Sequence, residues 1–190
     1  MSMVWDDFTE LAQRVRAPGP GVDSGPVRDM IRSIGIDHSM GFGDVTAAVV
    51  PPAGVFTLSA DAYSKGDGFI EWAPKVGVFD FSEFERFAIT GKLDHGQMLA
   101  TLALYDGIGK SEHPVHVEGE FSHAWDIPSF SGVVLSHITT VRLDLGMERF
   151  AQDMALTSVS VDVPTVGSGA LVVGGIVAMM ASKFANRRIR

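Results

Sequence analysis

Hydrophobic and polar residues alternate with a period of two along much of the chain after residue 45. The alternation is clear in 55–63 (VFTLSADAY), 133–145 (VVLSHITTVRLDL) and 156–163 (LTSVSVDV). It is typical of strands that bury one face and expose the other. The segment 97–105 (QMLATLALY) is apolar on both faces, as a central strand would be. Turn signals such as PPAG, KGDG, DHG and DGIGK separate these runs. We therefore expect about eight strands between residues 45 and 163, in an antiparallel sandwich or jelly roll.

The N-terminal part of the chain follows a different period. Apolar residues recur at helical spacing over 3–16, and Asp6 and Asp7 would lie near the positive end of the helix dipole. The sequence APGPG ends this predicted helix. A second short helix follows in the prediction, with Ser24 as its cap and Gly35 after its end. We expect one or two helices before the β-domain.

The C-terminal stretch from Val163 to Ser182 carries no formal charge. As a helix it would be about 30 Å long, which matches the hydrocarbon core of a bilayer. Small residues recur at every fourth position, a pattern of helices that pack closely in membranes: Ala170, Gly174, Ala178 and Ser182. A basic tail follows, suited to lipid head groups or nucleic acid: Lys183, Arg187, Arg188 and Arg190. The pattern predicts a single membrane-spanning anchor; a buried helix in a protein assembly and a glycine-rich strand or loop are the alternatives.

These patterns divide the chain into an N-terminal helical segment (1–35), a β-sandwich domain (36–163) and a C-terminal anchor with a basic tail (164–190). Hydrophobic residues make up 46% of the chain and charged residues 20%, a composition that favours a packed core over disorder. The net charge of -8 argues against a nucleic-acid-binding surface on the body of the protein. Cysteine is absent, which excludes disulfides and thiolate metal sites. The N-terminus lacks the pattern of a signal peptide, so we expect synthesis in the cytoplasm.

Candidate chemistry concentrates in residues 113–123 (HPVHVEGEFSH). His113, His116, Glu118 and His123 are of the residue types that form cupin-like metal sites, but a solvated strand face explains the same spacing. No serine lies in a nucleophile-elbow context, and GFGDVTA is a weak match to a nucleotide-binding loop. His137 fits a core or interface position better than a catalytic one. We therefore assign no catalytic, cofactor-binding or metal-binding residue, and expect no enzyme activity and no cofactor.

An aromatic cluster lies beside Trp72 and is expected to fill one end of the core, with a contact between subunits as the alternative. Its members are Phe79, Phe81, Phe84 and Phe87. A helix is also expected over the segment SEFERFA, where Ser82 and Glu85 could form a capping box.

The predicted layout resembles that of coat and minor capsid proteins of membrane-containing viruses, although no motif carries the resemblance. It implies a structural protein that fastens a shell to an internal membrane. The expected partners are a lipid bilayer, through the C-terminal helix, and copies of the same chain or other subunits. The basic tail would add a weak contact with nucleic acid or anionic lipid, and no small-molecule substrate is expected. The alternatives are a single-span accessory subunit of a cellular membrane complex and a cupin-like metalloenzyme.

Overall fold

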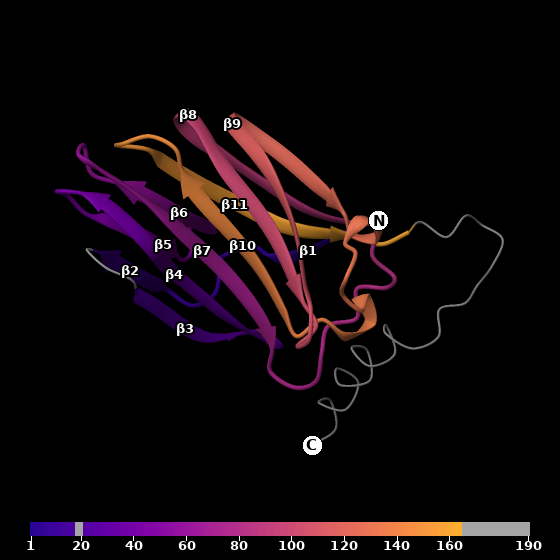
Figure 1. Cartoon of the computed structure of the whole chain (residues 1–190). Coiled ribbons are helices and arrows are strands. Elements are labelled where there is room, and N and C mark those ends of the chain that lie inside the picture. The colour runs from indigo at the N-terminus through magenta and orange to yellow at the C-terminus, as the bar shows by residue number, and fades with distance from the viewer. Residues whose placement is uncertain (18–20, 165–190) are drawn as a thin grey trace, which may run out of the picture.

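The computed structural model describes residues 1–17 and 21–164, which fold into an antiparallel β-structure of eleven strands (Figure 1). The strands are β1 (Ser2–Asp6), β2 (Gln13–Ala17), β3 (Gly21–Val27), β4 (Met30–Gly41), β5 (Val45–Val50), β6 (Val55–Ala60), β7 (Ser64–Pro74), β8 (Arg86–Tyr105), β9 (Lys110–Asp126), β10 (Thr140–Met147) and β11 (Asp153–Asp162). Two short 3-10 turns, Ile127–Ser129 and Leu135–His137, complete the secondary structure of the described residues.

The strands follow the order β2-β5-β6-β11-β8-β10-β7-β4-β3, with β1 beside β11 and β9 beside β8. Two layers arise because β8 bends in the middle. Its residues 86–93 pair with β11, whereas its residues 98–105 pair with β10. β9 follows the same bend (Figure 1). The first sheet therefore contains β11, β6, β5 and β2, and the second contains β10, β7, β4 and β3.

Glycine makes the two bends possible. Gly96 in β8 has φ +70° and Gly119 in β9 has φ +55°, backbone conformations that other residues adopt only at a cost. The turn predicted at DHG is therefore wrong: the segment lies within β8, at the bend that carries this strand from the first sheet into the second. Between residues 45 and 163 the structure has seven strands rather than eight, two of them bent.

The core lies between the two sheets and is built from the alternating apolar positions. Phe56 and Leu58 of β6 and Val159 and Val161 of β11 are buried, and the polar residues between them face outward. Leu143 of β10 closes the core from the opposite sheet. The predicted faces of these strands are confirmed.

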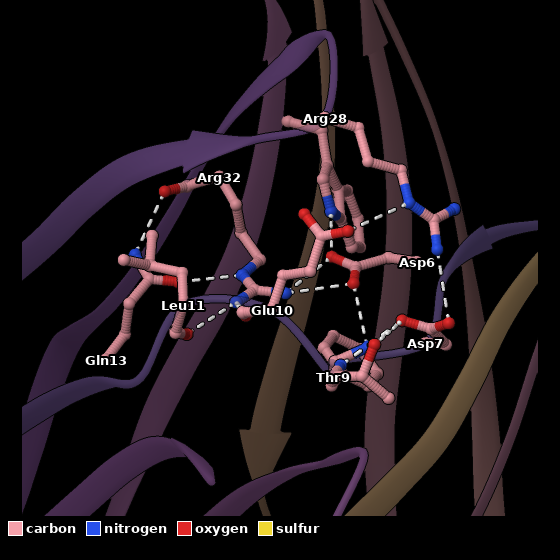
Figure 2. Close-up of polar contacts among 10 residues, drawn as sticks. Asp6, Asp7, Thr9, Glu10, Leu11, Gln13, Arg28 and Arg32 are labelled. Carbon is pink, nitrogen blue, oxygen red and sulfur yellow. Dashed lines mark hydrogen bonds and ion pairs between the residues drawn. The ribbon is translucent and has the colours of Figure 1, made fainter. Parts of the chain in front are cut away.

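The predicted N-terminal helices are wrong. The segment 3–16 contains β1, a connection and β2, and the expected second helix is the hairpin of β3 and β4. The physical reason is a buried ion pair that the sequence pattern could not show. Asp6 accepts hydrogen bonds from Arg32 Nη1 at 2.9 Å to each carboxylate oxygen, and both side chains are almost fully buried (Figure 2).

The remaining hydrogen-bonding groups of this pair are also satisfied. Arg32 Nε donates to Gln13 Oε1, and Arg32 Nη2 donates to the carbonyl oxygens of Glu10 and Leu11 (Figure 2). Asp6 also accepts from the indole nitrogen of Trp72 at 2.8 Å. A buried charge is tolerated only when its partners are complete. An irregular connection between β1 and β2, in which Phe8 and Leu11 have positive φ, therefore replaces the helix and lets residues 6–13 wrap around Arg32.

Gln13 joins the two sheet edges on this side of the sandwich. Its amide nitrogen donates to the carbonyl oxygen of Asp23 in β3 at 2.9 Å and to that of Arg32 in β4 at 3.0 Å. Because Gln13 belongs to β2, the edge of the first sheet is tied to the edge of the second. The sandwich is nearly closed there, and its shape resembles a jelly roll.

The aromatic cluster is confirmed as core. Phe81 and Phe87 are fully buried, and Trp5 contacts them with ring centres 5.5 and 6.3 Å away. The helix expected over SEFERFA is wrong, because the segment forms a turn and then enters β8. Ser82 donates to the Asp80 carboxylate there instead of capping a helix.

In the range 1–17 and 21–164 no helix has the length and apolar character needed to cross a membrane. The predicted anchor face and basic tail lie outside the described residues: Ala170, Gly174, Ala178, Ser182, Lys183, Arg187, Arg188 and Arg190.

Candidate functional site

The outer face of the second sheet gathers polar side chains from three strands. In β10 the outward residues Arg142 and Asp144 alternate with buried apolar ones. Arg142 lies opposite Glu71 of β7, and Asp144 lies opposite Phe69 of the same strand. Residues opposite one another in a sheet share a face. The four side chains therefore meet on the surface that points away from the core.

Arg142 is the centre of this arrangement. The central carbon of its guanidinium group lies 3.8 Å from the centre of the Phe69 ring. Its Nε donates to Asp144 Oδ1 at 2.7 Å, and Nη1 lies 3.6 Å from Glu71 Oε2. Its Nη2 donates to Asp37 Oδ2. One planar cation is thus stacked on an aromatic ring and surrounded by three carboxylates, and we call these five residues the Arg142 cluster.

Two features of β4 and β7 shape the cluster. A β-carbon on Gly35 would lie 2.3 Å from the Phe69 ring, so only glycine lets this ring lie against the sheet. The β-bulge between Ile36 and His38 in β4 leaves Asp37 and His38 exposed in succession. β7 lies between β4 and β10 in the sheet, and the bulge lets the Asp37 carboxylate of β4 reach across β7 to Arg142 of β10.

The electrostatics of the cluster favour a fixed, charged Arg142. Burial opposes its positive charge, but the hydrogen bond that Arg142 donates to Asp144 and the charges of Asp144, Asp37 and Glu71 raise the pKa of Arg142 above its ordinary value. Beside the cluster, burial of its carboxyl group raises the pKa of Asp67, an effect that the nearby His38 opposes. Three carboxylates around one cation leave this face with a negative charge.

The carboxylates of the cluster remain open to solvent. The side chains of Asp37, Glu71 and Asp144 are 51%, 32% and 34% exposed, whereas that of Arg142 is 20% exposed. Each carboxylate offers about four lone-pair positions and gives only part of them to Arg142. The free positions point to solvent and can accept hydrogen bonds from a ligand.

A shallow pocket of about 490 Å³ adjoins the cluster at Glu71. Tyr105 at the end of β8, Lys110 at the start of β9 and the connection between them form one wall, and the start of β10 forms the other. The Lys110 ammonium lies 5.6 Å from the centre of the Tyr105 ring. The pocket therefore combines an aromatic ring, a cation and a carboxylate, as ligand sites commonly do.

Asp106 holds the pocket wall in place. Its carboxylate accepts hydrogen bonds from the backbone nitrogens of Gly109 at 2.6 Å, Val134 at 2.9 Å and Ile108 at 2.9 Å. These bonds lower the pKa of Asp106 to about 2. The wall is therefore tied both to itself and to the loop before β10, and it presents Ile108 fully exposed beside the pocket.

The arrangement suits recognition of an uncharged ligand that carries several hydroxyl groups. Exposed carboxylates accept hydroxyl hydrogens, guanidinium and ammonium groups donate to hydroxyl oxygens, and aromatic rings pack against apolar ring faces. The excess of negative charge disfavours anions. A metal site is not indicated, since no group of three metal-ligating side chains occurs in the described part of the chain.

The predicted metal-ligand candidates are not brought together. They lie on β9, an edge strand, where His113 stacks on Phe130 with ring centres 4.2 Å apart. His123 meets Trp125 edge-on at 4.7 Å, whereas His116 pairs with Glu148 at 2.9 Å. Glu118 accepts a hydrogen bond from Gln97 at 3.2 Å. The alternative of a polar strand face is the better account, and charged side chains suit an edge strand because they discourage pairing with another chain.

His137 lies in a 3-10 turn before β10 and is exposed, so the core alternative is wrong, whereas the interface alternative stays a prediction. The alternation over 133–145 predicts that Arg142 and Asp144 share the polar face of their strand, but it does not indicate Asp37, Glu71 and Phe69 as their neighbours. The only signal was the alternation around Glu71, because the partner strands come from distant parts of the chain.

No protein-family model and no curated protein matches this chain. Among solved structures, a part of the agarase AgWH50C is similar with a TM-score of 0.50 and 9% identity over 85% of this chain and 26% of the agarase. A family 11 carbohydrate-binding module from Clostridium thermocellum, in complex with a β-1,3-1,4-mixed-linked tetrasaccharide, has a TM-score of 0.47 and 11% identity over 85% of this chain and 95% of the module. TmCBM61 in complex with β-1,4-galactotriose has a TM-score of 0.42 and 9% identity, covering 77% of this chain and 90% of that one.

These findings correct the functional prediction from sequence. The similar structures are carbohydrate-binding modules and an agarase, not coat proteins or membrane subunits. Residues 1–17 and 21–164 contain no helix that is long and apolar enough to cross a membrane, and the predicted anchor falls on residues outside these ranges. The match to part of the agarase AgWH50C shows a shared fold.

Proposed function

We propose that this β-sandwich is a non-catalytic carbohydrate-binding domain, and that the Arg142 cluster with its adjoining pocket holds an uncharged sugar chain. The observation that carries the proposal is the guanidinium of Arg142, stacked on Phe69 and surrounded by Asp37, Glu71 and Asp144 with their outer oxygens exposed. Such a cluster orients several hydrogen-bonding groups at fixed positions before any ligand arrives. Pre-organised groups of this kind reduce the entropy lost on binding.

The choice of an uncharged sugar follows from the charges on this face. An anionic polysaccharide would meet three carboxylates for one guanidinium group. A metal ion is not indicated, because no group of three metal-ligating side chains occurs in the described part of the chain. A chain of neutral sugars carries hydroxyl donors for the carboxylates, hydroxyl acceptors for Arg142 and Lys110, and apolar ring faces for Tyr105.

The test measures binding of the full chain to soluble β-1,3-1,4-glucan, β-1,4-galactan and agarose, with polygalacturonate as the anionic control. Isothermal titration calorimetry and migration in polysaccharide-containing native gels give the affinity. Reducing-end release from each polysaccharide is measured in parallel. We expect binding to at least one neutral polysaccharide, none to polygalacturonate, and no release of reducing ends.

Variants then locate the site. Asp37→Asn and Glu71→Gln keep the shape of the side chains but remove charged acceptors, so each should weaken binding about tenfold. Arg142→Lys keeps the charge and loses the planar fork, with a similar expected loss. Arg86→Ala is the matched control, because Arg86 forms an exposed ion pair with Asp126 away from the cluster. Binding that is insensitive to all three site variants, or no binding to any neutral polysaccharide, would refute the proposal.

A further inference from the structure

Three exposed aromatic side chains lie at the end of the sandwich opposite the pocket. Phe42 follows β4 and is fully exposed, Tyr63 precedes β7 and is 74% exposed, and Phe150 lies between β10 and β11 and is 48% exposed. The three connections that carry them occur together at this end (Figure 1). We call Phe42, Tyr63 and Phe150 the aromatic rim. Large apolar side chains gathered on a surface commonly mark a contact site.

The loops that carry the rim are locked to one another through Ser64. Its hydroxyl accepts a hydrogen bond from the Gly43 nitrogen at 2.8 Å, and its carbonyl oxygen accepts one from Ala151 at 3.0 Å. The Phe42 nitrogen donates to the Tyr63 carbonyl oxygen at 3.3 Å. All three rings are therefore attached to backbone that is fixed relative to the others.

The loop of Phe150 has a second support in Gln152, which is fully buried. Gln152 Nε2 donates to the carbonyl oxygens of His95 and Gln97, each at 2.8 Å. Its Oε1 accepts from the backbone nitrogens of Glu148 at 3.1 Å and Arg149 at 3.4 Å. Four hydrogen bonds of one buried side chain thus fix this loop. They hold the backbone that carries the Phe150 ring in place.

The aromatic rim is continuous with the Arg142 cluster. Lys65, Asp67, Phe69 and Glu71 point outward from β7, since alternate residues of a strand share a face. The Lys65 ammonium lies 5.9 Å from the centre of the Phe150 ring. From Lys65 to Glu71 the strand covers about 20 Å. One face thus leads from the pocket, across the Arg142 cluster, to the rim.

We infer that the aromatic rim is a second contact surface for the same ligand, and that this ligand is an extended polysaccharide lying along β7 from the pocket to the rim. The inference rests on the proposed function and adds to it the length and direction of the ligand. A mono- or disaccharide cannot reach both surfaces, whereas a longer chain can. Sugar rings stack on aromatic rings through their apolar faces while polar groups such as Lys65 and Asp67 reach the hydroxyls between them.

A neutral sugar chain fits this surface better than a protein partner. The face that leads to the rim is polar and carries carboxylates along its length, with small residues such as Gly146 between the charged ones. No pair of rim rings is in mutual contact among the described residues, so the rings form separate platforms and not one apolar core. The core of a protein interface would be a continuous apolar surface depleted of charge.

The experiment measures the affinity of the full chain for neutral oligosaccharides of increasing length, prepared from the polysaccharide that binds. Phe42→Ala, Tyr63→Ala and Phe150→Ala are compared with Val76→Ala, which truncates an exposed residue, 91% accessible, in a loop at the other end. We expect wild-type affinity to rise with chain length, and each rim variant to lower it about two- to tenfold for long chains only. Tyr63→Phe keeps the ring and should retain wild-type affinity within about twofold.

The outcomes separate this inference from the proposed function. If long and short chains bind all rim variants as they bind the wild type, the inference is wrong and the Arg142 site stands. If no oligosaccharide binds and the Arg142 variants change nothing, the proposed function is wrong, and the inference that rests on it is wrong with it. Sedimentation velocity provides the remaining check: a wild-type dimer that Phe42→Ala converts to a monomer would assign the rim to self-association and overturn the inference.

Discussion

The buried pair of Asp6 and Arg32 offers the sharpest test of how this fold is held together. Asp6→Ala removes both oxygens that accept from Arg32 Nη1, and it also removes the acceptor of the Trp72 indole and of the Phe8 backbone nitrogen. The change leaves a guanidinium charge and two further donors buried without partners. Water cannot replace the lost oxygens easily, since the Arg32 side chain is fully buried.

The expected magnitude follows from that burial. Removing one partner of a buried ion pair costs about 3–5 kcal/mol of the free energy of unfolding. For a chain of this length each kcal/mol lowers the melting temperature by about 2–4 °C. We therefore expect Asp6→Ala to melt about 6–20 °C below the wild type, and its urea midpoint to fall without a change in the slope of the transition.

The control variant is Asp7→Ala, at the residue that follows Asp6 in the chain. Asp7 pairs with Arg28 at 3.2 Å, but both side chains are about two-fifths exposed. Asp7→Ala should therefore cost less than about 1 kcal/mol. The double variant Asp6→Ala with Arg32→Met removes the unpaired charge and should recover part of the loss. A melting temperature for Asp6→Ala no lower than that of Asp7→Ala would refute the assignment of this pair as a main stabilising contact.

Two further predictions concern the candidate site. Gly35→Ala places a β-carbon 2.3 Å from the Phe69 ring, so it should lower the free energy of unfolding by about 1–3 kcal/mol in urea titrations and weaken sugar binding; an unchanged midpoint would show that the ring moves away freely. Because the pKa of Asp106 is depressed to about 2, its stabilisation of the pocket wall is complete above the ordinary value of 3.8 and is lost as the pH falls toward 2. The protection of the Gly109 and Ile108 amides, measured by NMR relative to the exchange rate of an unstructured amide at each pH, should fall over that range, and a transition centred near pH 4 would contradict the geometry.

The sequence by itself determined the face that β6, β10 and β11 bury. Period-two alternation is a local property, because successive side chains point to opposite sides of a strand whatever its neighbours are. Phe56 and Val159 were therefore assigned correctly to the core, and Arg142 to the outer face. The DHG segment was predicted as a turn but lies within β8, where Gly96 with its positive φ marks the bend of the strand.

The N-terminal segment shows where local pattern fails. Its apolar residues fit a helical period, and in isolation a helix is a reasonable solution. The fold instead needs Asp6 beside an arginine 26 residues later in the chain, and Gln13 between two sheet edges. Two short strands joined by an irregular connection satisfy those distant groups, and a helix does not. A tertiary contact of this strength overrides a modest local preference.

The candidate site was decided by tertiary structure almost entirely. Asp37, Glu71 and Arg142 come from three strands separated by 34 and 71 positions in the sequence, and only the strand order β4-β7-β10 brings them together. A β-bulge and the absence of a side chain on Gly35 then fix the geometry. Alternation along one strand reveals which residues face outward, but the chemistry of a sheet face depends on its neighbours, and these are set by long-range pairing that no local pattern encodes.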